Sequence, residues 1–245
     1  MPTYDLSKQL ARLMVATGER EGTRTVALLT TMDEPLGRFS GNWCEVRECV
    51  DIMRGVRHPM SADLITLSNI LSGWMLHLAG HAPTPEAGAQ LADQYLHSGA
   101  AYQAWLKIIA AQGGDITIFD NPDLSCHPSQ SGGPASAFTY NSAATTQLLA
   151  PSSGFLSGMD CKEVGWAVQR LGAGRAKPGG PVSAAAGIQV HAKLGDRVTV
   201  GQPLVTLFAD TAAQLAEPLA MLAATFRIAD TPPTLQPQIR EVVTK

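Results

Sequence analysis

The sequence predicts an α/β protein: an incomplete α/β layer with several helices, followed by a small β-rich module near the C-terminus. Two observations predict this class. Residues 24–31 form a short, continuously apolar run between turn residues, which is typical of a strand buried on both faces of a parallel sheet. Residues 187–210 contain short alternating apolar stretches separated by glycine turns, which is typical of small β-strands.

Composition narrows the class of protein. The chain has 245 residues, 45% hydrophobic and 16% charged, which indicates a globular protein of one large or two ordinary domains. The formal net charge of -3 gives no electrostatic case for nucleic acid or an anionic membrane surface as a partner. No apolar run reaches the roughly 18 residues that span a bilayer. The first residues show no secretory signal, so we expect a cytoplasmic protein whose cysteines are free thiols.

Apolar spacing and turn signals predict the elements of the first half. A helix capped by Asp5 or Ser7 runs to about Glu21 and precedes the strand of residues 24–31. Residues 32–42 predict a loop. Helices follow at residues 43–53, 64–79, 84–98 and 100–112. The first of these four has an apolar stripe of Val46, Cys49, Val50 and Met53, and the second is apolar nearly all round, so we expect it to be buried. A buried strand needs sheet neighbours, but no second strand of this kind appears before Gly114.

The second half begins with a stretch rich in Pro, Ser, Gly and Asn, residues 120–146, which predicts a long surface connection. After it we expect a strand and turn over residues 148–157, a helix over residues 161–171, three strands within residues 187–210, a helix over residues 212–229 interrupted by Pro218, and a polar end piece. The predicted domains are therefore residues 1–119 and 147–245, joined by the connection 120–146.

No strong catalytic motif is present, and the weak signals favour structural roles. His77 and His81 have a metal-binding spacing, but no Glu lies between them as in HExxH. His127 beside Cys126 lacks companion ligands. Residues 172–175 suit the C-terminal turn of a helix better than a phosphate loop. Residues 187–210 resemble the hammerhead barrel-sandwich of biotinyl and lipoyl carriers, but no lysine occupies the modified position, so a structural module is the favoured interpretation.

Two stretches together resemble one family. Residues 28–48, LLTTMDEPLGRFSGNWCEVRE, resemble the strand, loop and helix of thymidine and pyrimidine-nucleoside phosphorylases. Residues 154–160 (GFLSGMD), 171–175 (LGAGR) and the hammerhead of residues 187–210 resemble the C-terminal domain of that family. Order and spacing match over nearly the whole chain, least clearly across residues 120–146.

The resemblance implies an enzyme that uses phosphate to cleave thymidine or uridine into base and pentose 1-phosphate, without a covalent cofactor. Members of the family are homodimers whose site lies in a cleft between an all-α and an α/β domain, and the cleft closes on phosphate and nucleoside. The phosphate loop, the catalytic histidine, the base-contacting residues and the dimer-forming helices of the family have no counterpart here. We therefore expect a C-terminal portion that is inactive alone. The alternative is a non-catalytic binding or interaction module derived from the family.

The resemblance also implies a bound monovalent cation, potassium. Its ligands would be the backbone carbonyls of Leu36 and Phe39 and the side chain of Glu48, and hard oxygen ligands suit such an ion. The remaining ligands of the family come from the phosphate loop, so the site would be incomplete in this chain. The alternative for Glu48 is a solvated residue on the surface of its helix.

Overall fold

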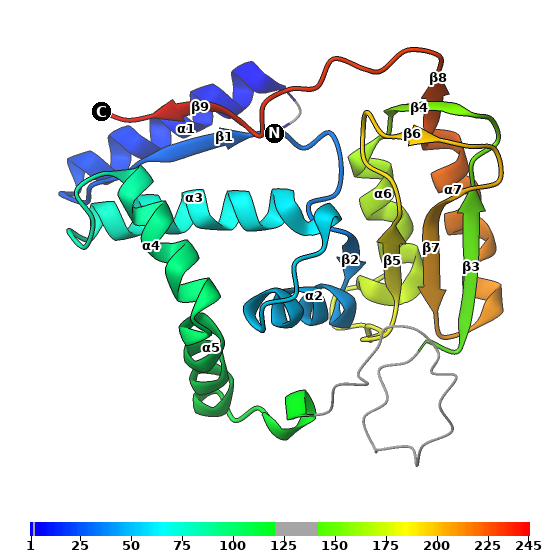
Figure 1. Ribbon diagram of the computed structural model, residues 1–245, viewed down its shortest axis with the longest axis horizontal. Coiled ribbons are helices and arrows are strands. Elements are labelled where there is room, and N and C mark those ends of the chain that lie inside the picture. The colour runs from blue at the N-terminus through cyan, green and yellow to red at the C-terminus, as the bar shows by residue number, and fades with distance from the viewer. Residues whose placement is uncertain (2, 121–141) are drawn as a thin grey trace. The chain divides into compact units, whose positions relative to one another are not determined.

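The computed structural model describes residue 1, residues 3–120 and residues 142–245 (Figure 1). The chain forms two compact units that interleave in sequence. The first unit comprises residues 1–32, 63–94 and 234–245, and the second comprises residues 33–62 and 95–233. Within the described ranges, no helix has the length and apolar character needed to cross a membrane. The domain boundaries expected from the sequence stay a prediction, and Cys126 and His127 lie outside the described residues.

The first unit is built on a helix and a two-stranded sheet. Helix α1 (Tyr4–Arg20) packs against β1 (Ala27–Thr30) and β9 (Ile239–Val243), as Figure 1 shows. The strands are antiparallel, with Leu29 opposite Glu241. Ala11 and Val15 of α1 bury themselves against Leu29 and Val243. Thr3, rather than Asp5 or Ser7, caps α1, because its hydroxyl accepts the Leu6 N–H.

The partner of β1 corrects two expectations. The run of residues 24–31 was expected to lie in a parallel sheet and to be buried on both faces, but β1 is antiparallel and only Leu29 is fully buried. The expected polar end piece supplies the strand β9. Among the described strands, β9 is the one neighbour of β1, so the sheet is as incomplete as the sequence indicates.

Helices α3 (Ala62–Leu78) and α4 (Pro85–His97) lie mainly in the first unit. They approach closely where Gly73 faces Gly88: a Cβ atom at Gly88 would lie 2.4 Å from the Gly73 carbonyl oxygen. The expectation that α3 is buried is wrong. Gly73 is its one fully buried residue, and Leu71 and Met75 are exposed, because within this unit only a part of the helix surface is covered.

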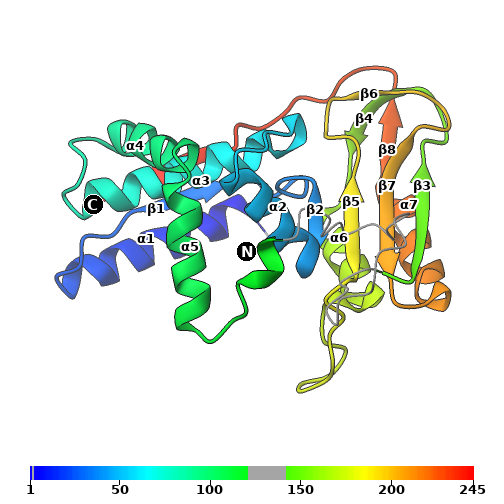
Figure 2. The same ribbon diagram turned by 60° about the horizontal axis from the view of Figure 1, so that its bottom comes forward.

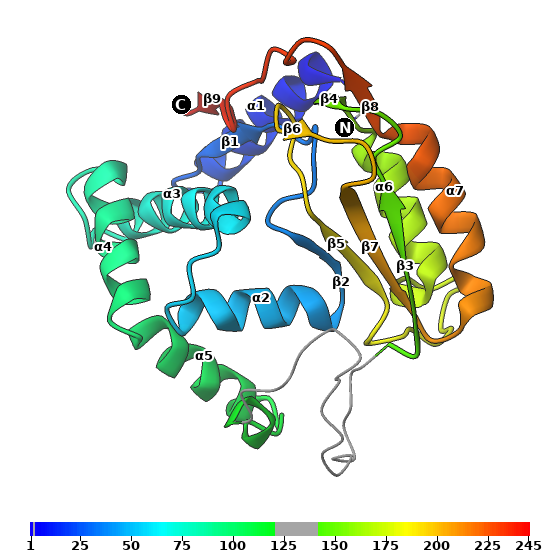
Figure 3. The same cartoon turned by 45° about the vertical axis from the view of Figure 1, so that its right-hand side comes forward.

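The second unit contains the main core, a four-stranded antiparallel sheet of order β2-β5-β7-β3. Its strands are β2 (Phe39–Gly41), β3 (Ala144–Leu149), β5 (Gly187–Val190) and β7 (Pro203–Ala209). Residues 204–209 of β7 are all buried. Helices α6 (Cys161–Val168), continued by a π-turn (Gln169–Ala173), and α7 (Ala216–Thr225) lie on the same side of this sheet (Figure 3).

A second, three-stranded sheet has the order β6-β4-β8 and gathers at one end of the longer strands (Figure 2). It is formed by β4 (Gly154–Gly158), β6 (Arg197–Val198) and β8 (Arg227–Ala229). The three strands expected within residues 187–210 are confirmed as β5, β6 and β7, and no described sheet closes into a barrel. The class is thus a mixture of helices and antiparallel sheets.

Three boundaries in the second unit differ from the sequence-based expectation. Residues 39–41 are a strand and not loop, because β5 supplies their partner. Residues 144–146 belong to β3 and not to the surface connection. The expected helix of residues 212–229 is a 3-10 turn (Ala212–Gln214), then α7, then the strand β8. Pro218 does not interrupt α7, because it lies in the first turn, where its missing N–H has no partner to lose.

Helices α2 (Trp43–Met53) and α5 (Ala100–Ala111) complete the second unit, with 3-10 turns at Pro59–Ser61 and Thr117–Asp120. Aromatic residues pack between them: the Phe119 ring lies 5.8 Å from that of Trp43 and 4.6 Å from that of Trp105. The buried face of α2 differs from the expected stripe. Val46 and Cys49 are exposed, and the face that is buried consists of Trp43, Cys44, Glu48, Val50 and Ile52.

Candidate functional site

The loop before β2 folds over one buried carboxylate, that of Glu48. Glu48 lies in the second turn of α2 and is 2% exposed. The Arg38 backbone N–H donates to Oε1 at 3.1 Å and to Oε2 at 3.2 Å, and the Phe39 N–H donates to Oε2 at 3.3 Å. The carboxylate therefore fixes the end of the loop against α2, and Glu48 is not the solvated residue of the alternative interpretation.

A hydroxyl and a guanidinium complete the surroundings of Glu48. The Ser61 hydroxyl donates to Oε1. The Arg38 Nε lies 3.6 Å from the same oxygen, and the Arg38 Nη2 lies 3.8 Å from Asp51. Asp51 in turn pairs with the Arg47 Nε at 2.8 Å. These ion pairs form a row of alternating charge, here called the charge row, which runs from Glu48 through Arg38 and Asp51 to Arg47. Its formal charges sum to zero.

The backbone of β2 places the Phe39 carbonyl beside this cluster. The Val190 N–H donates to the Arg38 carbonyl, and Phe39 lies opposite Gln189. Phe39 therefore belongs to a pair that does not exchange hydrogen bonds with β5, and its own N–H and C=O face the other edge of β2. The N–H meets Glu48 on that edge, so the Phe39 carbonyl lies on the side of the carboxylate.

Leu36 occupies the same loop, next to Gly37. The Leu36 side chain is exposed, whereas Gly37 is buried against the carboxylate. A Cβ atom at Gly37 would lie 2.8 Å from the Glu48 Oε2, and the φ angle of +69° also favours glycine. The structure thus brings Leu36, Phe39 and Glu48 into one loop and one helix turn.

Residues of the hammerhead also contact the loop of residues 34–39. The Lys193 ammonium donates to the Pro35 carbonyl oxygen, and the Leu194 N–H donates to the Glu34 carboxylate at 2.8 Å. The loop of residues 34–39 is therefore fixed between α2 and the turn that follows β5.

The donors around Glu48 bear on the predicted potassium site. A carboxylate offers about four lone-pair positions. Two contacts of the Arg38 N–H, one of the Phe39 N–H and one of the Ser61 hydroxyl already use them. An ion bound directly to Glu48 would have to displace one of these donors and would meet the Arg38 guanidinium. The arrangement as it stands does not fit a directly bound cation, and cation binding stays a prediction.

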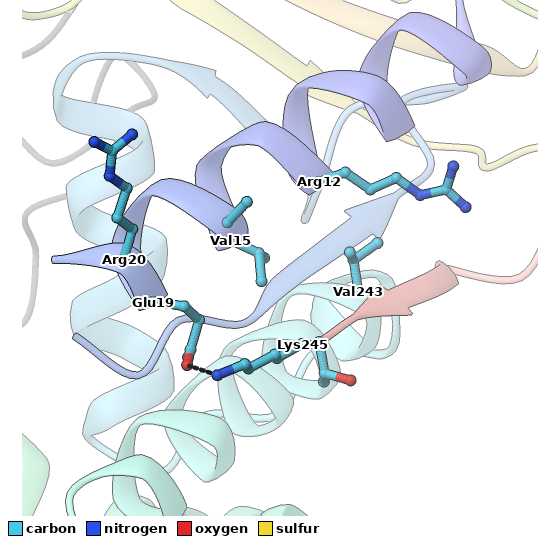
Figure 4. Close-up of a pocket in the computed structure, with 8 residues that line it drawn as sticks. Arg12, Val15, Glu19, Arg20, Val243 and Lys245 are labelled. Atoms are coloured by element: carbon cyan, nitrogen blue, oxygen red, sulfur yellow. Dashed lines mark ion pairs between the residues drawn. The ribbon is translucent and has the colours of Figure 1, made fainter. Parts of the chain in front are cut away.

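A pocket of about 400 Å³ lies in the first unit, between α1 and the end of β9 (Figure 4). Its charged lining residues are Arg12, Glu19, Arg20 and Lys245. Lys245 pairs with Glu19 at 3.9 Å, and the Arg12 and Arg20 side chains point in opposite directions (Figure 4). The cationic groups do not converge on one point, so this arrangement does not form a binding site for a single anion.

The weaker sequence signals have local roles. The His77 Nδ1 lies 3.1 Å from the Ala82 carbonyl oxygen, and its ring packs edge-on against Trp74. Gly172, with a φ of +110°, ends the π-turn after α6, as expected for the C-terminal turn of a helix. No cluster of three or more His, Cys, Asp or Glu residues suited to a metal occurs in the part of the chain that the structure describes.

Sequence reasoning missed Arg38 and Ser61 as partners of Glu48. One signal was present: Cys44, Glu48 and Ile52 are spaced four residues apart and share one face of α2, and that face is buried. A carboxylate between two apolar residues at this spacing indicates a buried charge that needs a partner. The partner comes in part from Ser61, which reaches Glu48 only because the chain turns back after α2. The local sequence of α2 does not encode this turn.

Two family models match the chain in sequence order. The a/b domain of a glycosyl transferase family matches residues 1–102, and the C-terminal domain of pyrimidine nucleoside phosphorylase matches residues 155–229. The first range contains Leu36, Phe39 and Glu48, and the second contains β4 except its first residue, α6 and the hammerhead strands.

Curated relatives agree with these matches. Thymidine phosphorylase from Mycobacterium tuberculosis, strain CDC 1551 / Oshkosh, is 36% identical over 234 residues, and the same protein from strain H37Rv gives the same figures. The alignment covers 95% of this chain and 48% of the relative. The chain therefore spans about half the length of the curated relatives it matches.

Proposed function

The chain belongs to the thymidine and pyrimidine-nucleoside phosphorylase family, and from this premise we propose that it forms part of an enzyme that cleaves thymidine or uridine with phosphate. A phosphate oxygen bonds to C1′ of the pentose while the C1′–N bond breaks. The electron pair leaves with the base, which takes up a proton, and pentose 1-phosphate is the second product. The observation that carries this proposal is the 36% identity over 95% of the chain.

The second part of the proposal is that this chain alone does not catalyse the reaction. Stabilising an oxocarbenium-like transition state between phosphate and base requires convergent cations and hydroxyls. Among the described residues, the one pocket given above has divergent arginines, and the charge row is already neutral. The phosphate and nucleoside contacts, and the homodimer of the family, would require segments that correspond to the other half of the relatives.

The surface of the first unit supports this proposal. Leu6, Leu10, Leu13 and Met14 form an exposed apolar stripe on α1, at the spacing of one helix face. The sheet below α1 has two described strands, and a sheet this small is marginal by itself. An apolar stripe beside an incomplete sheet is the surface expected where further elements of the catalytic domain pack.

The test is an assay of the purified chain with thymidine or uridine and phosphate, in which the released base is separated and quantified. The thymidine phosphorylase from M. tuberculosis is the positive control. We expect no phosphate-dependent release from the chain alone. We expect release once the chain is co-expressed with the half of that relative to which it does not align. Turnover by the chain alone would refute the claim of inactivity.

The co-expression arm separates the proposal from its alternative. If a stable complex forms and phosphate-dependent release follows, the chain is a part of the enzyme. If the complex forms without release of base, the enzymatic proposal is wrong, and the alternative of a non-catalytic module that binds a partner is favoured.

A further inference from the structure

Burial of Glu48 raises the question of which group balances its charge. A carboxylate that leaves water is destabilising unless a cation and hydrogen bonds compensate it. The hydrogen bonds are present, but two backbone amides and a hydroxyl carry no net charge. A full positive charge must come either from a bound ion or from a side chain.

Arg38 is placed to supply that charge. Its side chain is 16% exposed, its Nε lies 3.6 Å from the Glu48 Oε1, and its guanidinium carbon lies 4.8 Å from the centre of the Phe39 ring. The Arg38 Nε is buried and has no hydrogen-bond partner among the described atoms. Arg38 therefore acts on Glu48 through its charge, while the Glu48 oxygens are occupied by other donors.

The rest of the charge row keeps Arg38 in this position. The Arg38 Nη2 faces Asp51 at 3.8 Å, and Asp51 is held by Arg47 at 2.8 Å along the same helix. Glu45, the other carboxylate of this helix turn, is exposed to solvent and accepts the Gly41 N–H at 2.8 Å. Within the described part of the chain, Arg38 thus pairs with the buried carboxylate, and Arg38 is itself fixed by an aromatic ring and a second carboxylate.

We propose that Arg38 is the built-in counter-ion of Glu48 in this chain and takes the place of a monovalent cation. The loop of residues 34–39 is then ordered without potassium. An added cation would have to enter beside the Arg38 guanidinium, where the repulsion between like charges is strong at short distance and low dielectric. This inference rests on the fold of the second unit alone and does not depend on the proposed function.

The first measurement compares cations on the unmodified chain. Thermal unfolding is followed in potassium chloride and in tetramethylammonium chloride at equal ionic strength, because the large organic cation cannot enter a carbonyl-lined site. We expect the two melting temperatures to agree within about 1 °C, which lies below the shift that 1 kcal/mol of binding would produce in a chain of this size. A saturable increase in the melting temperature with potassium would overturn the proposal.

The second measurement is a double-mutant cycle of Arg38→Met and Glu48→Gln. Alone, Arg38→Met leaves a buried carboxylate unpaired, and we expect the melting temperature to fall by roughly 5–10 °C. In the Glu48→Gln background, Arg38→Met should lower the melting temperature much less, because no negative charge remains to be balanced. Arg170→Met is the matched control: Arg170 pairs with Glu217 at 2.9 Å, outside the charge row and within the same unit, so the effect of this change should not depend on Glu48→Gln.

Two further outcomes decide the matter if Arg38→Met does not fold. Arg38→Lys keeps the charge without the planar guanidinium, and we expect it to retain most of the stability. The double variant Arg38→Met/Glu48→Gln should fold where the single variant does not. Additive effects in the cycle, or a double variant that is no more stable than Arg38→Met, would show that Arg38 acts only by packing, and the proposal would be wrong.

Discussion

Two facing glycines allow β2 and β5 to approach closely. Gly41 lies opposite Gly187 in the register, and a Cβ atom at Gly187 would lie 2.6 Å from the Ser40 carbonyl oxygen and 2.8 Å from the Cys44 sulfur. A backbone oxygen cannot move aside as the end of a flexible side chain can. Glycine at this position therefore sets the distance between the strand that carries Phe39 and the hammerhead.

We expect Gly187→Ala to lower the free energy of unfolding by about 1–3 kcal/mol, the usual cost of overpacking a core. The matched control is Gly165→Ala in α6, where a Cβ atom would meet nothing within 4 Å. Because alanine favours a helix more than glycine does, the control should gain about 0.5–1 kcal/mol. Urea titration measures both values. Equal effects at the two positions would contradict the steric explanation.

A carboxylate also joins α1 to β9. Glu241 accepts hydrogen bonds from the Lys8 ammonium, at 2.7 Å, and from the Tyr4 hydroxyl. These hydrogen bonds hold the pKa of Glu241 below its ordinary value, the Lys8 bond having the largest effect. The ionised form is therefore favoured in the folded state.

The direction of the pH effect follows from this lowered pKa. The contribution of Glu241 is fully present above the ordinary glutamate pKa near 4.5, and it is lost as the pH falls through the lower pKa of the folded state. We expect hydrogen exchange in β9, corrected for intrinsic rates, to speed up on acidification below that value. Glu241→Gln should weaken β9 at neutral pH and flatten this dependence. An unchanged acid response in Glu241→Gln would assign the effect to another carboxylate.

At the scale of elements, local patterns predicted what local contacts decide. The existence and the C-terminal end of α1 and the three strands of residues 187–210 follow from apolar spacing and glycine turns, and the structure confirms them; the cap of α1 was placed two to four residues too late. Strands β2 and β9 were missed because their pairing partners lie far away in sequence. Residues 239–242 alternate between half-buried and exposed positions in a two-stranded sheet, and of this strand only Val243 is buried, so its polar residues suggested a tail.

The residues of the candidate site likewise fall into those that could be predicted and those that could not. Resemblance placed Leu36, Phe39 and Glu48 together, and the structure brings them into one loop and one helix turn. The partners of the Glu48 carboxylate could not be predicted, because Ser61 reaches it from 13 positions away and only after the chain turns back at Pro59. The expected apolar stripe of α2 failed for the same reason: the covered face is decided by β2 and α5, and not by the sequence of α2 alone.

The crossing of α3 and α4 makes a prediction at this scale. Gly73 and Gly88 are both buried. A Cβ atom added at either position would lie 2.4 Å from a backbone oxygen of the other helix. We expect Gly88→Val to separate the helices and to lower the free energy of unfolding by about 2 kcal/mol or more. Gln90→Val is the control, because Gln90 is exposed on the same helix and the change introduces the same side chain. A similar loss for both variants in urea titration would point to helix propensity and not to the crossing.

At the scale of the molecule, the chain leaves the first unit after residue 32 and returns to it twice, the second time with residues 234–245. These residues bring β9 to β1 and place Val243 against Leu29 and Val15. The second unit keeps a core of its own around β5 and β7, to which the last 12 residues contribute nothing buried. The two units should therefore respond differently to the loss of the C-terminal segment.

We expect a chain that ends at Pro233 to lose protection against hydrogen exchange in β1 and α1. Without β9, the backbone of β1 is unpaired on that edge, and Leu29 loses its contact with Val243 and becomes exposed to water. Protection in β5 and β7 should stay close to that of the full chain. A chain that ends at Val243 keeps β9 and is the control. Hydrogen exchange read by mass spectrometry on peptides from each unit makes the comparison. If β1 kept its protection without β9, the strand pairing would not be what stabilises the first unit. If β7 lost protection as well, the two units would unfold together and the division into separate cores would be wrong.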